Sequence, residues 1–299
     1  MPAHDARTQA ARGALAEARA DMSLTAIAAT LRQQLAPLLP GLNVEVLATC
    51  PSTNTTLLDR ARAGDATPCL LVAETQTQGR GRLGRSWLSA PDSAPGASLT
   101  FSLALPLALS DWNGLSLAVG VAVADALDDA DDRSRIALKW PNDLWHRDAP
   151  GRGRKLGGIL IETLVAAQQR VVVIGIGINV LPHSDEGLSH GRASLQEIDA
   201  QASAARALQT IATPLVRAVR RFETDGFAPF VAAYARRDLL RGIHVSTTLP
   251  TVPAGVAEGV DEHGALLVRV GADLHRISSG EVSVRLFAAA AVAKAEAGH

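Results

Sequence analysis

The chain has 299 residues, a formal net charge of −1, and an apolar share of 47% with only 3% aromatic residues. This length suggests one large domain with one small companion, and the balanced charge argues against a strong general attraction to nucleic acid. Charged residues interrupt the alanine-rich first 22 residues, so no signal peptide is expected, and no other apolar run could span a membrane. Cys50 and Cys69 fit neither a disulfide framework nor a zinc spacing, which is typical of a cytoplasmic protein.

The first predicted elements lie between residues 24 and 105. Apolar residues at helical spacing predict a helix from Leu24 to Leu35, and alternation predicts a short strand over 42–46. Residues 69–73 are typical of a buried strand, and residues 99–105 alternate like a strand with one buried face. Between the first two strands, Ser52-Thr53-Asn54 precedes an apolar helix and, taken alone, indicates an N-cap.

The remaining elements change in character near Gly242. An alanine- and valine-rich helix is predicted over 114–129, then strands over 136–140, 156–164 and 170–178, then helices over 208–222 and 227–239. Short strands and a hairpin turn at 261–264 follow, which predicts a small all-β module. We therefore expect an N-terminal extension (1–22), a main domain (23–240), a β-module (241–287) and a disordered tail (288–299).

The most informative segment is the glycine- and arginine-rich stretch Gly79–Trp87. Its glycines allow tight turns that present backbone N–H groups to an anion, and Arg80, Arg82 and Arg85 supply donor forks suited to phosphate or carboxylate. Trp87 offers a flat face on which a nucleobase can stack. Because three crowded arginines repel one another unless an anion offsets them, a bound anion is favoured over a solvated basic turn.

Two other motif matches fail on their context. Gly79, Gly81 and Gly84 satisfy the dinucleotide-binding pattern G-x-G-x-x-G, but the proline-rich residues 90–96 cannot form the helix that this pattern requires. Residues 187–191 match the nucleophile elbow G-x-S-x-G of serine hydrolases, but a polar loop precedes them where a strand is needed. No P-loop motif occurs, and the histidines show no metal-ligand spacing.

Three further segments place polar side chains at strand ends. In Lys139–Leu144 a proline stops the strand and leaves Asn142 and Asp143 at a sheet edge, where ligands gather; a structural turn has equal weight. Lys155–Glu162 opens an apolar strand with one lysine and two glycines that allow a ligand to approach closely. Gly175–Asn179 ends a strand with an amide that suits an adenine edge or a turn cap, and the cap is favoured when the residue is taken alone.

These segments, from Ser52-Thr53-Asn54 to Gly175–Asn179, resemble in order and approximate spacing those of bacterial biotin protein ligases. Ser279–Arg285 also resembles the closing strand of that family's C-terminal barrel, so the resemblance covers roughly residues 23–287. It implies an α+β fold, in which a catalytic domain like that of class II aminoacyl-tRNA synthetases, with helices against a mixed sheet, precedes an SH3-like barrel. It also implies that biotin and ATP form biotinyl-5′-AMP, and that a lysine of the biotin carboxyl carrier domain of a biotin-dependent carboxylase then takes the biotin.

The resemblance also implies roles for individual residues. Those expected at biotin are Ser52, Thr53, Asn54, Gln76, Arg80, Gly81, Arg82, Lys155 and Gly158. Those expected at ATP or the adenylate are Arg82, Arg85, Trp87, Lys139, Asn142, Asp143 and Asn179. Arg82 and Lys155 are the expected catalytic residues, and Asp143 is the candidate ligand of Mg²⁺. Because adenylation joins two anions, a site rich in positive charge agrees with this chemistry, and no covalent nucleophile is expected.

The resemblance is incomplete in two places. Only some 22 residues precede the expected catalytic domain, too few for the winged helix of some family members, so no binding of operator DNA is expected. The stretch Ser89–Ser98 is longer than its counterpart in the family. A second loop, Pro182–Arg192, is expected to become ordered over the adenylate when the ligand binds. The protein is expected to be a monomer or a homodimer.

Two alternatives remain open. One is a lipoate or octanoate ligase of the same fold, and the other is a biotin or nucleotide sensor without turnover. The glycine–arginine segment favours biotin over lipoate, and the complete charged set favours turnover over sensing.

Overall fold

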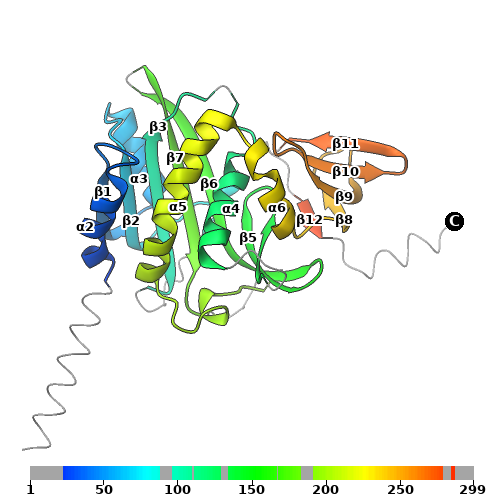
Figure 1. Ribbon diagram of the computed structural model, residues 1–299, viewed down its shortest axis with the longest axis horizontal. Coiled ribbons are helices and arrows are strands. Elements are labelled where there is room, and N and C mark those ends of the chain that lie inside the picture. Colours follow the sequence, from blue (N-terminus) through cyan, green and yellow to red (C-terminus); the bar gives the residue numbers. More distant parts are fainter. Residues whose placement is uncertain are drawn as a thin grey trace, which may run out of the picture.

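The computed structural model describes residues 23–87, 96–109, 111–128, 134–166, 168–182, 191–278 and 284–286 (Figure 1). Several expectations therefore lie outside the described residues, wholly or for the most part. They concern the N-terminal extension, Ser89–Ser98, Pro182–Arg192, the G-x-S-x-G match, the start of Ser279–Arg285, and the C-terminal tail. Within the described ranges, no helix is both long enough and apolar enough to cross a membrane.

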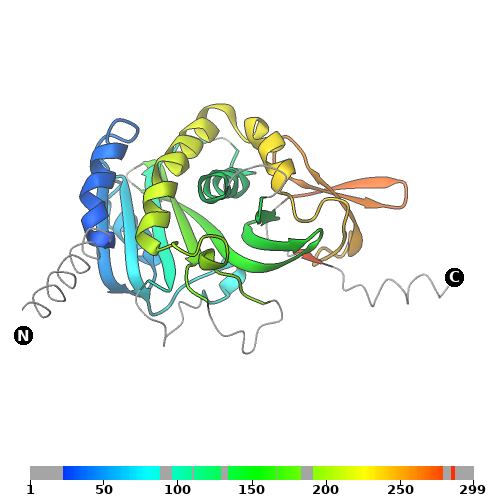
Figure 2. The ribbon, with the colours of Figure 1, turned by 60° about the horizontal axis from the view of Figure 1, so that its bottom comes forward.

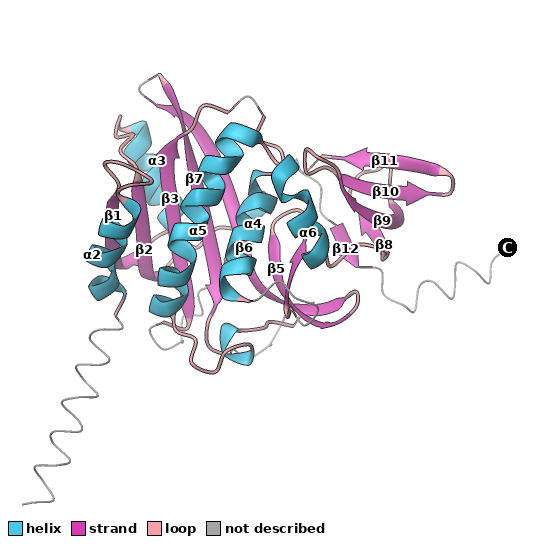
Figure 3. Cartoon of the chain, viewed as in Figure 1, coloured by secondary structure: helices cyan, strands magenta, loops and turns pink. Residues whose placement is uncertain are grey.

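A mixed sheet of seven strands, in the order β1-β2-β3-β7-β6-β5-β4, forms the larger part of the protein (Figures 1 and 3). β1 and β2 run parallel, and every other neighbouring pair is antiparallel. This sheet confirms the predicted α+β class. The strands are β1 (Asn43–Cys50), β2 (Cys69–Gln76), β3 (Ser98–Pro106), β4 (Ile136–Lys139), β5 (Asp143–Ala149), β6 (Arg152–Ala166) and β7 (Gln169–Asn179).

The two faces of this sheet differ because side chains alternate along each strand. One face carries buried isoleucines of β7, such as Ile174, and is covered by α2 (Leu24–Leu35), α4 (Leu115–Leu127) and α5 (Ala204–Asp225) (Figure 2). On the opposite face α3 (Thr53–Arg62) packs against β2, β3, β6 and β7. The main core therefore lies on the first face, and α3 leaves part of the second face open.

A second sheet of five antiparallel strands, in the order β11-β10-β9-β8-β12, confirms the predicted small all-β module. The carboxylate of Asp261 closes the predicted turn at 261–264, because it accepts hydrogen bonds from the N–H groups of His263 and Ala265, each over 2.9 Å. The strands are β8 (His244–Thr247), β9 (Ala254–Val260), β10 (Leu266–Val270), β11 (Asp273–Ile277) and β12 (Val284–Leu286).

The single helix predicted over 227–239 is wrong in part. Pro229, which lacks an N–H donor and suits only a first turn, lies in the 3-10 turn Ala228–Phe230, and α6 (Val231–Arg237) follows. Helix α6 ends at Arg237, and the chain is extended at Asp238. The N–H of Leu239 donates to the carbonyl oxygen of Leu138 over 3.0 Å, which binds this part of the chain to β4.

Three strand predictions also need correction. β3 is buried on both faces rather than one, since Thr100 and Ser102 are as inaccessible as their apolar neighbours. Strand β5 was missed, because residues 146–148 are polar and give no apolar alternation. β6 also begins earlier than predicted, so Lys155 lies inside the strand instead of at its mouth.

Candidate active site

One cavity of about 630 Å³ lies on the open face of the large sheet, and every predicted site residue lines it. Its walls come from the start of α3, the end of β2, the glycine–arginine segment, the β4–β5 connection, and strands β6 and β7. Val284 and Arg285 of β12 add a contribution from the small sheet. Segments that are far apart in the sequence thus meet around one space.

Glycines form the floor of this cavity. Gly158 of β6 and Gly177 of β7 are register partners in the centre of the sheet. A Cβ atom on Gly177 would come within 2.5 Å of the indole of Trp87, and one on Gly175 would collide with the amide of Asn54. Glycine is therefore required where these two side chains approach the sheet.

The glycine–arginine segment forms a closed turn at the side of the cavity. The N–H of Gly81 donates to the carbonyl oxygen of Arg85 over 2.7 Å, and the N–H of Trp87 donates to that of Gly79 over 2.9 Å. Gly84 has a φ of 70° and ends a single 3-10 turn, after which the chain is extended. Within the described part of this segment no helix begins at Gly84, although the dinucleotide-binding pattern requires one there.

A chain of hydrogen bonds joins the start of α3 to β2 and β3. Ser52 accepts from the N–H of Thr55 at 3.5 Å, which confirms the predicted N-cap. The N–H of Thr53 donates to Gln76 Oε1 over 2.7 Å. Ser102 Oγ lies 2.7 Å from Thr53 Oγ1 and 2.6 Å from Asn54 Oδ1.

The direction of these hydrogen bonds follows from the single hydroxyl hydrogen of Ser102. Because Asn54 Oδ1 can only accept, Ser102 donates to Asn54 and Thr53 donates to Ser102. The lone pairs of Thr53 Oγ1 and the amide hydrogens of Gln76 then remain for a ligand. Sequence reasoning missed Ser102, although the alternation of β3 already set it on the same face as Thr100.

Glu162 is a second residue that sequence reasoning did not assign. Its carboxylate accepts from Asn54 Nδ2 over 3.0 Å and forms an ion pair of 2.8 Å with Arg80. The side chain of Arg80 is 46% exposed, so this pair lies at the rim of the cavity rather than inside it.

Charged side chains also meet where β5 and β6 line the cavity. Lys155 Nζ is 2.5 Å from Asp143 Oδ1. Arg82 donates to Asn142 Oδ1 over 3.3 Å, and Asn142 Nδ2 donates to the carbonyl oxygen of Ile159 over 2.7 Å. Burial lowers the pKa of Arg82, because the charged guanidinium is partly removed from water. An anionic ligand would therefore gain from contact with this group.

Lys139 is the most deeply buried cation of the cavity wall. Its Nζ donates to the carbonyl oxygen of Val284 over 2.7 Å and lies 5.5 Å from the centre of the Trp145 ring. Burial lowers its pKa, whereas the negative charge of Asp143 opposes that shift. Lys139 thus binds the small sheet to the wall of the site.

Asn179 is 4% exposed, and its amide nitrogen is fully used. Nδ2 donates to the carbonyl oxygens of Lys155 over 3.3 Å and Ala193 over 3.0 Å. These contacts agree with the turn-cap interpretation and leave Oδ1 as the atom available to a ligand.

Asp143 was the candidate ligand of a metal ion. Within the described residues, no group of three or more His, Cys, Asp and Glu side chains is placed to hold a metal. A lone carboxylate suits Mg²⁺, which keeps several waters and binds through one or two carboxylates together with phosphate oxygens.

Comparison with known proteins identifies both parts of the chain. Residues 46–179 match the biotin/lipoate A/B protein ligase family, and residues 242–285 match the biotin protein ligase C terminal domain. The chain is 33% identical over 266 residues to the bifunctional ligase/repressor BirA of Escherichia coli, covering 85% of this chain and 77% of that protein. It is 34% identical over 247 residues to the biotin--[acetyl-CoA-carboxylase] ligase of Mycobacterium tuberculosis, covering 80% of this chain and 88% of that protein.

A solved structure agrees with the sequence relationship. The biotin protein ligase from Aquifex aeolicus in complex with biotin and ATP has a TM-score of 0.68 and 28% identity to this chain. The match covers 82% of this chain and 99% of that one. By sequence and by fold, the chain belongs to the biotin protein ligase family.

Proposed function

We propose that this protein joins biotin and ATP into biotinyl-5′-AMP and transfers the biotin to a lysine on the carrier domain of a biotin-dependent carboxylase. One observation carries the proposal. A single cavity presents a neutral hydrogen-bonding group, Thr53 and Gln76, together with cations that include Arg82 and Lys155. Biotin has the same division, with a neutral ureido ring at one end and a carboxylate at the other.

The neutral group suits the ureido ring. Thr53 Oγ1 has lone pairs to accept from a ureido N–H, and Gln76 Nε2 has hydrogens to donate to the ureido oxygen. Ser52 and Asn54 line the same wall, and the hydrogen bond from Asn54 to Glu162 fixes the amide in place. Arg80, Gly81 and Gly158 complete the set that we assign to biotin.

The cations suit the adenylation step. A carboxylate oxygen of biotin attacks the α-phosphorus of ATP, and the bond to the leaving pyrophosphate breaks. Arg82 and Lys155 reduce the repulsion between the two anions and stabilise the charge that develops on the phosphoryl oxygens. The ion pair of Lys155 with Asp143 keeps the amine in the cavity before the substrates arrive.

The nucleotide occupies the other part of the cavity in this proposal. Trp87 provides a stacking face for adenine, and Asn179 Oδ1 accepts from its exocyclic amine. Arg85, Lys139 and Asn142 lie along the phosphates. Mg²⁺, held by Asp143 and phosphate oxygens, would neutralise charge on the leaving pyrophosphate.

Transfer to the carrier requires orientation more than further chemistry. The amine of the carrier lysine attacks the acyl carbon of the adenylate, and AMP leaves. Holding the two reactants together is sufficient to accelerate such a step, and the site needs no covalent intermediate.

The alternatives give different outcomes in one experiment. The protein is incubated with ATP, Mg²⁺ and biotin, lipoate or octanoate, and pyrophosphate release is measured, followed by mass spectrometry of an added carrier domain. The proposal requires release with biotin and a carrier heavier by one biotinyl group. Equal release with lipoate would contradict the biotin assignment, and biotin binding without release would identify a sensor.

A further inference from the structure

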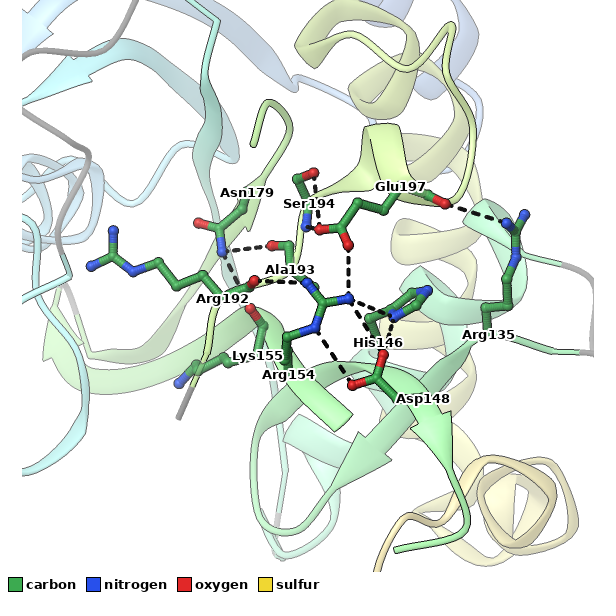
Figure 4. A network of polar contacts seen from close by, with 10 residues as sticks. All are labelled: Arg135, His146, Asp148, Arg154, Lys155, Asn179, Arg192, Ala193, Ser194 and Glu197. Atoms are coloured by element: carbon green, nitrogen blue, oxygen red, sulfur yellow. Dashed lines mark hydrogen bonds and ion pairs between the residues drawn. The ribbon is translucent and has the colours of Figure 1, made fainter. Parts of the chain in front are cut away.

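A polar network outside the cavity is centred on Arg154, the neighbour of Lys155 in β6 (Figure 4). Because side chains alternate along a strand, the two residues face opposite ways. Lys155 lines the cavity, whereas Arg154 is directed at Asp148, His146 and Glu197. Arg154 is not among the described residues that line the cavity.

The guanidinium of Arg154 binds three acceptors at once. One nitrogen donates to the carbonyl oxygen of Arg192 over 3.1 Å, and another donates to Glu197 over 2.7 Å and to Asp148 over 3.3 Å. A planar fork with fixed donors suits such a set, and the single ammonium of a lysine does not. The contact with the backbone of Arg192 makes the network more than a surface ion pair.

The two carboxylates are themselves held in place. Glu197 accepts from the N–H of Ser194 over 2.8 Å, and Asp148 lies 3.1 Å from His146 Nδ1. Burial by itself would raise the pKa of Glu197, but the hydrogen bonds from Arg154 and Ser194 outweigh it and hold the pKa below its usual value. The carboxylate therefore stays charged opposite Arg154 at neutral pH.

The segment that Arg154 binds, residues 191–197, also contacts the site directly. The N–H of Lys155 donates to the carbonyl oxygen of Gly191 over 3.0 Å, and the N–H of Ala193 donates back to that of Lys155 over 2.9 Å. Asn179 donates to the carbonyl oxygen of Ala193. The side chain of Arg192 lines the cavity and extends to the same side as Lys155 (Figure 4).

We propose that Arg154 is a positioning residue for the nucleotide. It fixes the segment 191–197 against β6, and the position of that segment determines where the amide of Asn179 and the side chain of Arg192 lie. The biotin end depends on other contacts, because Thr53 and Gln76 are bound to each other and to β3. This inference rests on the proposed function, since it assigns the nucleotide to the part of the cavity beside Asn179.

The test compares Arg154→Met with a matched control. Arg154→Met keeps the aliphatic stem and removes the fork. Arg60→Met removes a similar half-exposed arginine, which binds Glu45 over 2.7 Å and joins α3 to β1 away from the segment 191–197. Steady-state pyrophosphate release gives KM for ATP and for biotin, and calorimetry with a non-hydrolysable ATP analogue gives Kd without turnover.

We expect Arg154→Met to raise KM for ATP and Kd for the analogue roughly tenfold, with KM for biotin within about twofold of wild type. Arg60→Met should lower the melting temperature without changing the ratio of the two KM values. Arg154→Lys should remain impaired, because it cannot reach three acceptors. Equal changes in both KM values, or wild-type binding of the analogue, would overturn the proposal.

If Arg154→Met does not fold, Glu197→Gln removes one charge of the network and should raise Kd for the analogue in the same direction; an unchanged Kd contradicts the proposal. If the wild-type protein releases no pyrophosphate with biotin, the proposed function fails. The analogue Kd of each variant still decides whether Arg154 positions the nucleotide.

Discussion

The indole nitrogen of Trp140 donates a hydrogen bond to the carbonyl oxygen of Gly264 over 3.1 Å, and the tryptophan is completely buried. Gly264 belongs to the β9–β10 turn, whereas Trp140 directly precedes the cavity residues Pro141 and Asn142. The turn between two strands of the small sheet is therefore bound to a side chain next to the site. Lys139 makes a second such link through the carbonyl oxygen of Val284.

Removal of this link should reduce catalysis as well as stability. Trp140→Phe keeps the ring packing but leaves the carbonyl of Gly264 without its donor, which costs about 1 kcal/mol or more. We expect severalfold slower pyrophosphate release from Trp140→Phe. Trp112→Phe is the control, because the buried indole N–H of Trp112 has no partner within the described residues. Equal rates for the two variants would show that the link is only structural.

Lys155→Ala and Arg82→Ala should weaken adenylate formation far more than folding. Removing one such donor typically costs ~3 kcal/mol in the transition state, or about a hundredfold in rate. The loss of the half-exposed pair with Asp143 should cost little stability. Thermal melting beside biotin-dependent pyrophosphate release measures both effects, with Arg269→Ala, which breaks a pair in the small sheet, as control. A large fall in melting temperature with intact turnover would contradict the assignment.

Substitution of each of the two glycines of β7 should affect the binding of a different substrate. A methyl group on Gly177 would displace the Trp87 indole, so Gly177→Ala should raise KM for ATP. A methyl group on Gly175 would displace Asn54, so Gly175→Ala should raise KM for biotin. Each variant is the control for the other, because both change a central strand glycine. Parallel increases of both KM values in both variants would show a general distortion of the sheet instead.

Asp238 should make stability depend on pH in an unusual direction. Burial raises its pKa to about 6, and Oδ2 has no hydrogen-bond partner within the described residues. The folded protein then holds this proton more tightly than the unfolded chain, so the stability it contributes is present at low pH and is lost as pH rises through about 6. Asp238→Asn should remove that loss, up to about 3 kcal/mol, and raise the melting temperature at pH 7.5.

The matched variant for Asp238→Asn is Asp65→Asn. Hydrogen bonds from Thr67 lower the pKa of Asp65, so its contribution to stability is present above the ordinary pKa and is lost as pH falls. The pH dependence of chemical unfolding should therefore change in opposite directions in the two variants. If the unfolding free energy of Asp238→Asn depended on pH as that of the wild type does, the pKa of Asp238 would not be raised in the folded protein.

Much of the site was predictable because its residues lie in short, contiguous segments. Gly79–Trp87 and Lys139–Leu144 each carry several cavity residues, and local rules on glycine, proline and strand ends indicated where they would lie. The contacts between segments were not predictable. Asn54 and Glu162 are 108 positions apart, and no local pattern of either indicates that they meet.

Strand β5 and the polar network around Arg154 were not predicted, for related reasons. The polar residues of β5 do not alternate with apolar ones, since His146 and Asp148 face the network around Arg154 instead of a core. Burial of both faces of β3 depends on α3, which packs from elsewhere in the chain. In each case an element that is distant in the sequence contacts polar residues of a strand, and the strand's own sequence predicts that these residues are exposed to solvent.

The glycine floor has one further consequence. Gly158 and Gly177 are too small to fill the cavity of about 630 Å³ that they line with Trp87 and Lys155, so the protein alone does not complete its packing there. Under the proposed function, biotin and ATP occupy that volume, and their binding free energy adds to that of folding. A ligand at 100 times its Kd adds about 2.7 kcal/mol, a large part of the stability of an ordinary domain. The lifetime of the folded ligase in a cell would then follow the supply of the vitamin that it attaches.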